Sequence, residues 1–478
     1  MTSGRRLVRS ITWNFSGMTA PLLVGLLAIP LLIGGMGKER FGLLTIIWMG
    51  VGYFSLFDMG LGRALTKLVA ERLGRGEDDE LGSLIWTALW LIIGLGTIGA
   101  LLLFAGAGPL IRYVLNVQPG LEQEAETALR ILAVATAALR GLLEAHQRFD
   151  LIAYIRVPQG TFTFLGPLIT LQFSPSLVWA TSAMLGGRII ATCVYYTIVA
   201  SLMPEASSPR KPQGQHIRPL FFFGGWLTVT NVVGPLMVYF DRFFLGTVLT
   251  MTAVTYYVTP FEVLSRLQMV PAAVMGVLFP ALSTAQGGER STWLRLYDRT
   301  ARALLILMAP VVSVFFLFAP ETLSLWLGAE FSQHSAPVVR WLALGWLVNV
   351  MAHAPLTALQ TVGRPDLVAK THMAELVPYG ALLWVLTMQF GIVGTAAAWF
   401  LRVMVDTIIL NELARHVILD IHQLVLRTYR ELGIVLAIAA VLLTIDSVAG
   451  RALALTLIIG VLGIPAFFLG RDYVLRPE

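Results

Sequence analysis

Two ionisable residues, Glu262 and Arg266, lie near the middle of an apolar segment that is long enough to cross a membrane, Ala253 to Ser283. An ionised group at the centre of a bilayer is costly unless it faces a partner or water, so such a residue is a functional candidate. The four-residue spacing puts both side chains on one face of a helix. Pro260 and Pro271 bracket the pair. We therefore predict a kinked or broken helix whose freed backbone groups face a polar cavity.

Two further arginines reach a similar depth in other predicted helices. At about 1.5 Å per helical residue, Arg188, Arg266 and Arg402 each lie on the order of 15–20 Å from the outer surface, near the midplane. Arg402 is followed by Asp406, again at a four-residue spacing. Guanidinium groups bind phosphates through paired hydrogen bonds. These cations predict an anionic ligand in a water-accessible cavity, with Arg188, Arg266 and Arg402 as substrate-binding residues.

A second interpretation applies to every arginine and acid of this kind. Each pair can be a structural ion pair without a ligand, and residues near the ends of a span can reach the interface. Glu262 and Asp406 stay open between a proton-titrating switch and a counter-ion to the neighbouring arginine. Asp58, Arg63 and Arg156 lie closer to the predicted cytoplasmic side. The two arginines among them are further substrate-binding candidates. The structural interpretation is preferred for residues near an interface, namely Asp241, Arg242, Arg140, Lys370 and Glu375.

The composition identifies the class of protein that holds these residues. Of the 478 residues, 56% are hydrophobic and only 13% are charged, against about a quarter charged in soluble proteins. The chain has no long polar stretch, so we expect a polytopic, all-α integral membrane protein without a catalytic domain outside the membrane. A single cysteine, Cys193, excludes a disulfide framework and a thiolate metal cluster. No phosphate-binding loop, HExxH or GxSxG motif is present, so we predict no enzyme, no cofactor and no metal site.

Apolar windows of about 20 residues predict the elements that position the candidate residues. Loops on one side of these spans carry most of the lysines and arginines, including Arg5, Lys67, Arg210 and Arg290, which makes that side cytoplasmic. Both termini are then cytoplasmic. The formal charge of +6 reflects this loop bias and anionic membrane lipids, not nucleic acid. The fourteen predicted spans cover residues 11–34, 41–66, 82–105, 125–147, 150–172, 176–202, 219–247, 252–283, 300–319, 334–358, 367–388, 391–414, 431–448 and 452–470.

The longest polar, proline-rich segment, Pro204 to His216, follows the sixth predicted span. It suggests a transporter in which two halves rock around a central site, although a merely long loop is also compatible with the pattern. The predicted organisation is an N-terminal six-helix bundle over 1–203, a cytoplasmic linker over 204–216, a C-terminal six-helix bundle over 217–415, and two additional transmembrane helices over 416–478.

Six different short motifs are spread along the chain: FGLL at 41–44, FDMGLGRAL at 57–65, YFDR at 239–242, FPALS at 279–283, QTVGRP at 360–365 and GIVGTA at 391–396. Together with the span layout, they resemble the Wzx-type polysaccharide or oligosaccharide flippases of the MOP superfamily, which also contains MATE transporters and lipid II flippases. The resemblance extends over the whole chain. It implies a V-shaped pair of helical bundles with a central cationic cavity.

The resemblance also implies an activity. A flippase of this family moves a polyprenyl-diphosphate-linked oligosaccharide, such as an O-antigen, capsule or exopolysaccharide repeat unit, across the bacterial inner membrane by alternating access. Coupling to a proton or sodium gradient suits Glu262, Asp406 or Asp58. Asp58, Arg63, Asp241 and Arg242 match the family motifs, and the last two are gate or ion-pair candidates. A polysaccharide polymerase and a chain-length regulator are the implied protein partners.

Two other functions share parts of this pattern. A MATE-like drug or cation antiporter has the same expected fold, but an acidic cavity would suit cationic drugs better than an interior with more arginines than carboxylates. A membrane-embedded polysaccharide polymerase or glycosyltransferase would act on similar substrates. Such an enzyme is expected to carry catalytic residues on a substantial external loop, whereas the external loops here are short and nearly uncharged.

Overall fold

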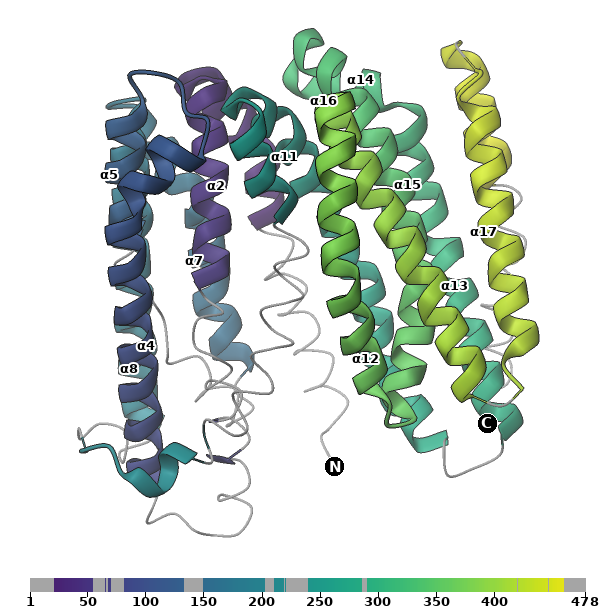
Figure 1. Ribbon diagram of the computed structural model, residues 1–478, viewed down its shortest axis with the longest axis horizontal. Helices are drawn as coiled ribbons and strands as arrows, with labels where there is room; N and C mark the ends of the chain where they lie inside the picture. The colour runs from purple at the N-terminus through teal and green to yellow at the C-terminus, as the bar shows by residue number, and fades with distance from the viewer. Residues whose placement is uncertain are drawn as a thin grey trace. The chain divides into compact units, whose positions relative to one another are not determined.

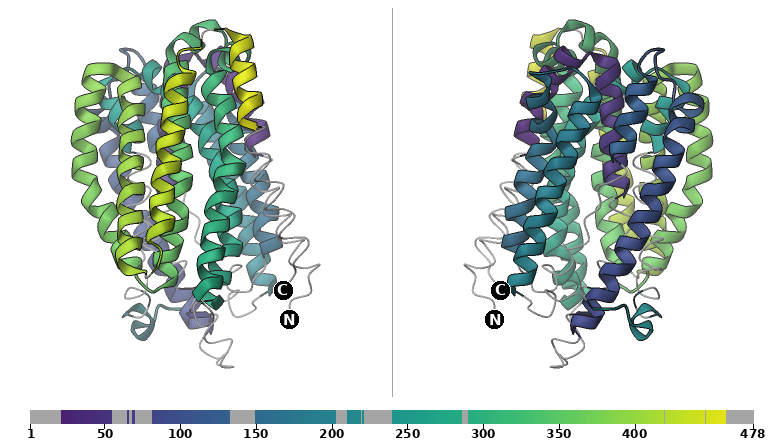
Figure 2. Two further views of the ribbon diagram at one scale, coloured as in Figure 1. Left: turned by 90° about the vertical axis from the view of Figure 1, so that its right-hand side faces the viewer. Right: turned by 90° about the vertical axis from the view of Figure 1, so that its left-hand side faces the viewer.

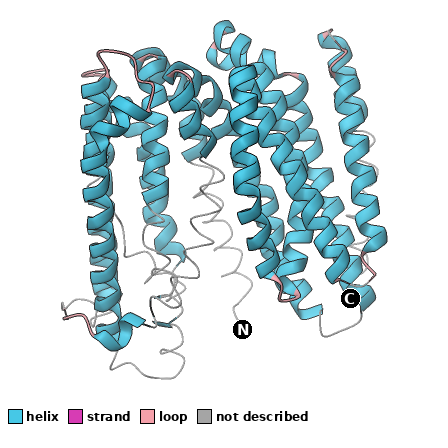
Figure 3. Cartoon of the chain, viewed as in Figure 1, coloured by secondary structure: helices cyan, strands magenta, loops and turns pink. Residues whose placement is uncertain are grey.

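The structure is a computed structural model in which the described residues form helices and no strand (Figure 3). This is what a membrane chain requires, because hydrocarbon offers no partner to backbone amides and carbonyls, and a helix satisfies them within itself. The all-α class is therefore confirmed for the described part of the chain. That part comprises residues 21–54, 81–132, 149–202, 210–218, 240–285, 290–418, 420–445 and 447–459, with positions 65, 68, 69 and 220.

The chain forms two compact units, Met1–Thr255 and Tyr256–Glu478, and the boundary falls within helix α11 (Met251–Ser265). The division at a linker over 204–216, the two six-helix bundles and the two additional helices stay predictions.

In the first unit, one carboxylate connects three helices. Glu124 of α5 pairs with Arg40 of α2 at 3.2 Å and accepts a hydrogen bond from the backbone amide of Leu177, the first residue of α8, at 2.5 Å. The first amides of a helix have no intrahelical acceptor, so an acid at this position satisfies one of them and complements the helix dipole. Besides short helical stretches at 214–218 and 240–248, the described residues of this unit form Pro21–Met36, α2 (Lys38–Phe54), α4 (Leu81–Pro109), the π-helical turn η1 (Leu110–Val114), α5 (Glu122–Leu132), α7 (Phe149–Leu171) and α8 (Leu177–Leu202).

The second unit is built around close packing of α15 on α16 (Figure 1). Gly345 of α15 lies against the Trp399 ring, which would be only 2.2 Å from a Cβ at that position. Trp399 also contacts Trp346 and Phe261, with ring centroids 5.1 and 5.7 Å apart, so a small residue permits an aromatic core. After α11 come η2 (Arg266–Gln268), α12 (Met269–Ala285), α13 (Arg290–Leu317), α14 (Ala319–Leu327), α15 (Ala329–Thr361), α16 (Pro365–Val417), α17 (His422–Leu442) and the helix Val448–Ile459.

Within the described residues, five helices are long and apolar enough to cross a membrane. They confirm a multi-pass membrane protein, whereas the count of fourteen spans stays a prediction. The five are Leu81–Val114, Leu177–Ile198, Ser291–Leu317, Ala329–Thr361 and Pro365–Val417.

Candidate functional site

Helix α16 consists of two arms that fold back on each other at Gly391. This residue has φ 58° and ψ −138°, a conformation that is essentially restricted to glycine. The hydroxyls of Thr387 and Thr395, four residues to either side, lie 2.8 Å apart. The fold-back agrees with the predicted division of this segment into spans 367–388 and 391–414.

The turn sets the register of the two arms. Residues at nearly equal distances before and after Gly391 face each other, as the contact between Thr387 and Thr395 shows. The Arg402 guanidinium lies over the Tyr379 ring, 5.5 Å from its centroid. These two residues are 11 and 12 positions from the turn. A cation over an aromatic face is stabilised by the ring quadrupole, by about 0.5–2 kcal/mol depending on its exposure.

One helical turn further from Gly391, two carboxylates meet. Glu375 lies 16 residues before the turn and Asp406 lies 15 residues after it. Glu375 is near enough to interact with Asp406, Arg402 and His372, but neither of its oxygens accepts a hydrogen bond from a donor group in the described structure. The two acids are only 7% and 5% exposed. Burying an acid without a full set of partners is costly.

Two histidines, His372 and His353, complete this polar group, which we call the carboxylate pair site: Glu375, Asp406, Arg402, Tyr379, His372 and His353. The Nε2 atom of His372 lies 3.4 Å from Oδ1 of Asp406. His353 of α15 also interacts electrostatically with Asp406, while its Nδ1 lies 2.9 Å from the Asn349 carbonyl.

A cavity of about 300 Å³ opens between the two arms at the carboxylate pair site. Glu375, Tyr379 and Arg402 line it, so the acid, the cation and the phenol ring all face the same space. No group of three or more His, Cys, Asp or Glu side chains is arranged to hold a metal ion in the described structure. The remaining lining residues are Thr371, Ala374, Pro378, Leu382, Leu401, Val405 and Ile409.

The charge balance of this site is incomplete. Two carboxylates face one guanidinium, so with both acids ionised and both histidines neutral the group carries one negative charge. Like charges at close range in a buried site disfavour each other. One proton or one monovalent cation would neutralise the group.

The predicted pair of Glu262 and Arg266 is confirmed as an ion pair within the second unit. Nη2 of Arg266 lies 3.7 Å from Oε2 of Glu262, and the two side chains are 38% and 27% exposed. The predicted break is a single 3-10 turn, η2, that begins at Arg266 directly after α11. Arg266 is thus half-buried at a point where regular helical geometry is interrupted.

The four-residue spacing of Arg402 and Asp406 left an ion pair along one helix open, and the described structure does not form it. Asp406 lies next to His372 and Glu375 on the opposite arm, while Arg402 stacks on Tyr379. Each of the two side chains thus contacts the opposite arm, because the antiparallel packing brings residues of that arm closer than their neighbour four residues along the same arm.

Three other predictions near the interface have different outcomes. Asp241 and Arg242, 0% and 4% exposed, are buried and do not reach water, and the Arg242 amide donates to Oδ1 of Asp241 at 2.7 Å. Glu375 is also buried, because the two arms of α16 fold back on each other, and it borders the cavity between them. Lys370 does, with its side chain 69% exposed and paired with Asp366 at 3.3 Å.

The remaining candidates are in different places. Arg188 lies in α8 of the first unit and is partly exposed. Asp58, Arg63 and Arg140 lie outside the described residues. Arg156 belongs to α7, but its side chain is also outside them.

Sequence reasoning did not group Glu375, His372 and Tyr379 with Arg402 and Asp406. The sequence does contain a pattern that could have grouped them: these residues lie at similar distances before and after Gly391, the glycine that separates two predicted spans. Depth counted along each span separately does not tell which side chains of two neighbouring spans face each other.

Comparisons with known proteins give a consistent result. The model of the family described as polysaccharide biosynthesis protein matches residues 36–336. The chain is 28% identical over 420 residues to a putative O-antigen transporter of Shigella flexneri, covering 85% of this chain and 97% of that protein.

Solved structures show the same fold at low identity. An inward-facing multidrug resistance MATE transporter of the MOP superfamily aligns with a TM-score of 0.71 at 14% identity, covering 84% of this chain and 97% of that one. The lipid II flippase MurJ in an inward closed conformation aligns with a TM-score of 0.66 at 14% identity, covering 98% and 100%. The MATE-like fold is thereby confirmed.

Proposed function

We propose that this chain, which belongs to the polysaccharide biosynthesis family of Wzx-type flippases, moves a polyprenyl-diphosphate-linked oligosaccharide across the bacterial inner membrane. That it is a polysaccharide flippase rests on the family match and on the similarity to the O-antigen transporter over nearly its whole length. The lipid-linked substrate, the inner membrane, the cytoplasmic termini and the fourteen spans are parts of the proposal. A polymerase and a chain-length regulator are its proposed partners.

In this proposal, arginines bind the diphosphate. Arg266 supports this role, because it is a half-exposed cation at the 3-10 turn of a broken membrane helix. Its partner Glu262 leaves part of the guanidinium accessible. Arg188, Arg402, Arg63 and Arg156 are proposed as further phosphate-binding residues, and Asp241 and Arg242 as a structural pair that supports a gate.

We further propose that the carboxylate pair site couples transport to a proton gradient. The observation that carries this is the buried pair of Glu375 and Asp406 on facing arms of α16, which has one negative charge more than its arginine balances. A proton would remove the excess charge and allow one carboxyl to donate a hydrogen bond to the other. Proton binding would then draw the two arms together across the cavity. Glu262 and Asp58 are the alternative coupling residues.

Transport by the purified protein tests the flippase proposal. The full chain is reconstituted in liposomes with a fluorescent polyprenyl-diphosphate oligosaccharide, and a membrane-impermeant glycosidase reports how much of the label is accessible outside. We expect accessible label to rise from the fraction in the outer leaflet toward all of it. Label that stays protected at the level of protein-free liposomes would contradict the proposal.

The same assay tests the arginine role. Arg266→Ala is expected to remove most transport, because the diphosphate loses a cation. Lys370→Ala, which removes an exposed cation of the same unit, is the matched control and should transport normally. A wild-type rate in Arg266→Ala would exclude this arginine from the binding site.

A second function is favoured by one observation. Buried carboxylates beside a cavity also suit binding of a cation, and the fold is shared with a multidrug transporter. A cation antiporter would accumulate an organic cation such as ethidium in proton-loaded liposomes without moving the lipid-linked sugar. The proposed flippase would do the reverse.

A further inference from the structure

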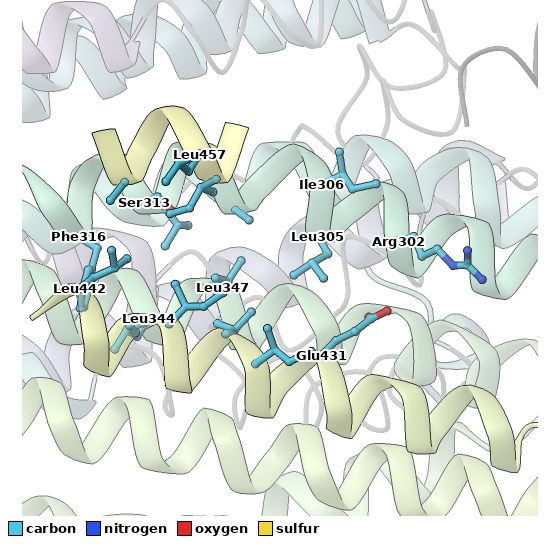
Figure 4. A pocket seen from close by; sticks show the side chains of 18 of the residues that line it. Arg302, Leu305, Ile306, Ser313, Phe316, Leu344, Leu347, Glu431, Leu442 and Leu457 are labelled. Atoms are coloured by element: carbon cyan, nitrogen blue, oxygen red, sulfur yellow. The ribbon is translucent and has the colours of Figure 1, made fainter. Parts of the chain in front are cut away.

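A second cavity in the C-terminal unit, of about 540 Å³, has walls of a different kind (Figure 4). It lies among α13, α15, α17 and the helix Val448–Ile459, which neighbour one another in the second unit (Figure 2). We call it the lipid groove. Its walls are almost entirely aliphatic and aromatic, and its charged lining residues are Arg302, Arg427 and Glu431.

The charged residues lie together at one end of the groove. Figure 4 shows Arg302 and Glu431 near each other, with Phe316 and Leu442 at the opposite end. From Arg302 to Phe316 the groove follows α13 for 14 residues, about 21 Å at 1.5 Å per residue. This is about two thirds of the ~30 Å hydrocarbon core. The apolar lining is therefore long enough for one extended hydrocarbon chain, and charged residues lie at one end of it.

The mouth is an electrically balanced chain of two arginines and two acids. Arg302 donates through Nε to Oδ1 of Asp298 at 3.1 Å, and its Nη2 also pairs with Asp298. Arg427 donates through Nε to Oε1 of Glu431 at 2.8 Å, and its Nη1 lies 3.6 Å from Oδ1 of Asp298. Nη1 of Arg302 and Nη2 of Arg427 have no hydrogen-bond partner among the described residues. Each arginine therefore keeps N–H donors for a further acceptor.

This arrangement distinguishes between classes of headgroup. A phosphate would accept from the remaining arginine N–H groups. An ammonium would donate to the Glu431 carboxylate, whose second oxygen is not used by Arg427. A headgroup with only negative charge offers Asp298 and Glu431 at most neutral hydroxyl donors and no positive charge to offset the carboxylates. A zwitterionic headgroup complements both signs.

We propose that the lipid groove binds one molecule of a zwitterionic aminophospholipid, of the phosphatidylethanolamine class. Its phosphate contacts Arg302 and Arg427, its ammonium contacts Glu431, and one acyl chain fills the groove as far as Phe316 and Leu442. The aliphatic walls match the acyl chain in polarity, so the chain exchanges bilayer contacts for groove contacts, and the headgroup contacts determine which lipid is preferred. The lipid is a resident of the fold and is distinct from the transported substrate, so this inference goes beyond the proposed function.

Native mass spectrometry of the purified, delipidated full chain tests the proposal. The protein is titrated with phosphatidylethanolamine or phosphatidylglycerol of identical acyl chains, and bound lipid is counted. We expect one ethanolamine lipid to bind about tenfold more tightly than the glycerol lipid, a ratio that corresponds to 1.4 kcal/mol. Equal affinity for both lipids, or tighter binding of phosphatidylglycerol, would overturn the proposal.

Variants separate the headgroup from the chain. Arg302→Gln should weaken binding of both lipids, whereas Glu431→Gln should remove only the preference for ethanolamine. Ala454→Trp, which places a large ring in the groove, should abolish the tight binding of one lipid. Arg295→Gln, an exposed arginine of α13 that does not line the groove, is the matched control.

The two headgroup variants keep the apolar walls intact, so they test the proposal even if Ala454→Trp disturbs folding. Unchanged lipid counts and affinities in both would overturn it. Polyprenyl phosphate serves as a competitor. If it displaces the ethanolamine lipid one for one at equal concentration, the groove holds the carrier's tail and the proposal of a resident phospholipid is wrong.

Discussion

The carboxylate pair site and the lipid groove lie in the same unit and are both formed between membrane helices, but they treat charge in opposite ways. In the carboxylate pair site, the acids Glu375 and Asp406 are 7% and 5% exposed and outnumber the arginine beside them. At the mouth of the lipid groove, Arg302 and Asp298 have side chains 35% and 20% exposed and signs that balance.

This difference implies that the carboxylate pair site must bind and release a charge, whereas the mouth of the lipid groove need not. A buried group with excess charge is stable only when a proton or cation is bound, so its occupancy depends on conditions. A balanced and partly solvated group has no such requirement, and its interactions are individually weak. The first arrangement suits coupling, and the second suits holding a ligand in place.

Neutralising the carboxylate pair should have the largest effect. In Glu375→Gln and in Asp406→Asn, we expect the stimulation of flipping by an imposed pH gradient to be lost, because the amide carries no titratable proton. A coupling free energy of 1–3 kcal/mol corresponds to a loss of about 5–150-fold. The measurement is the ratio of flipping rates with and without the gradient.

The control for the pair is Glu431→Gln, which neutralises a carboxylate at the mouth of the lipid groove. Its response to the pH gradient should equal that of the wild type. A wild-type response in both carboxylate pair variants would transfer coupling to Glu262 or Asp58.

The turn that aligns the two acids should be the next most sensitive position. Gly391→Ala places a side chain at φ 58° and ψ −138°, which should lower the free energy of unfolding by about 1–3 kcal/mol. Gly380→Ala, in the helical part of the same α16, has no atom within 4 Å of the new Cβ and should be neutral or stabilising. Thermal unfolding in detergent compares the two, and equal melting temperatures would mean that the turn tolerates a side chain.

A charge at the mouth of the lipid groove should matter less for stability. Arg302→Gln breaks the ion pair with Asp298. Because both side chains of this pair are partly solvated, the free energy of unfolding should fall by about 1 kcal/mol or less. Lipid-free protein in one detergent is the sample for this unfolding measurement, so that any bound lipid does not contribute. A loss of several kcal/mol would show that the mouth is as constrained as the buried site.

The smallest effect is expected at an exposed pair on the same helix as Glu375. Lys370→Ala removes a partner of Asp366 with the lysine side chain 69% exposed, so the change in the free energy of unfolding should be smaller than in Arg302→Gln. Unfolding at low and at high salt checks this, because screening should reduce even that difference. A larger change than in Arg302→Gln would reverse the order that exposure predicts.

The sequence indicated the helical membrane class and the local pairs better than the site. Glu262 and Arg266 pair as their spacing predicts, because four residues along one helix fix a common face. The position of Glu375 along its own span predicts a place near the membrane interface. Such a count of residues does not take into account that a neighbouring helix can cover the side chain. Its burial depends on the fold-back at Gly391, and the register of two antiparallel helices follows only once the position of their turn is known.

The same reason explains Arg402 and Asp406. Their spacing permits an ion pair along one helix, yet the opposite arm offers Tyr379 and His372 at closer range. The lipid groove was not predicted from the sequence at all. Its walls come from four helices whose lining residues extend from Arg302 to Ile458. Aliphatic side chains carry no pattern that distinguishes a groove from a packed core.

Proton movement driven by the substrate tests the central claim most directly. Liposomes that contain the full chain and a pH-sensitive dye are given the lipid-linked oligosaccharide on one side only, with no pH gradient imposed. We predict that wild-type protein moves protons as the substrate crosses, and that Glu375→Gln flips the substrate without moving protons. Equal proton movement in the two proteins, or none in the wild type while the substrate crosses, would contradict the account.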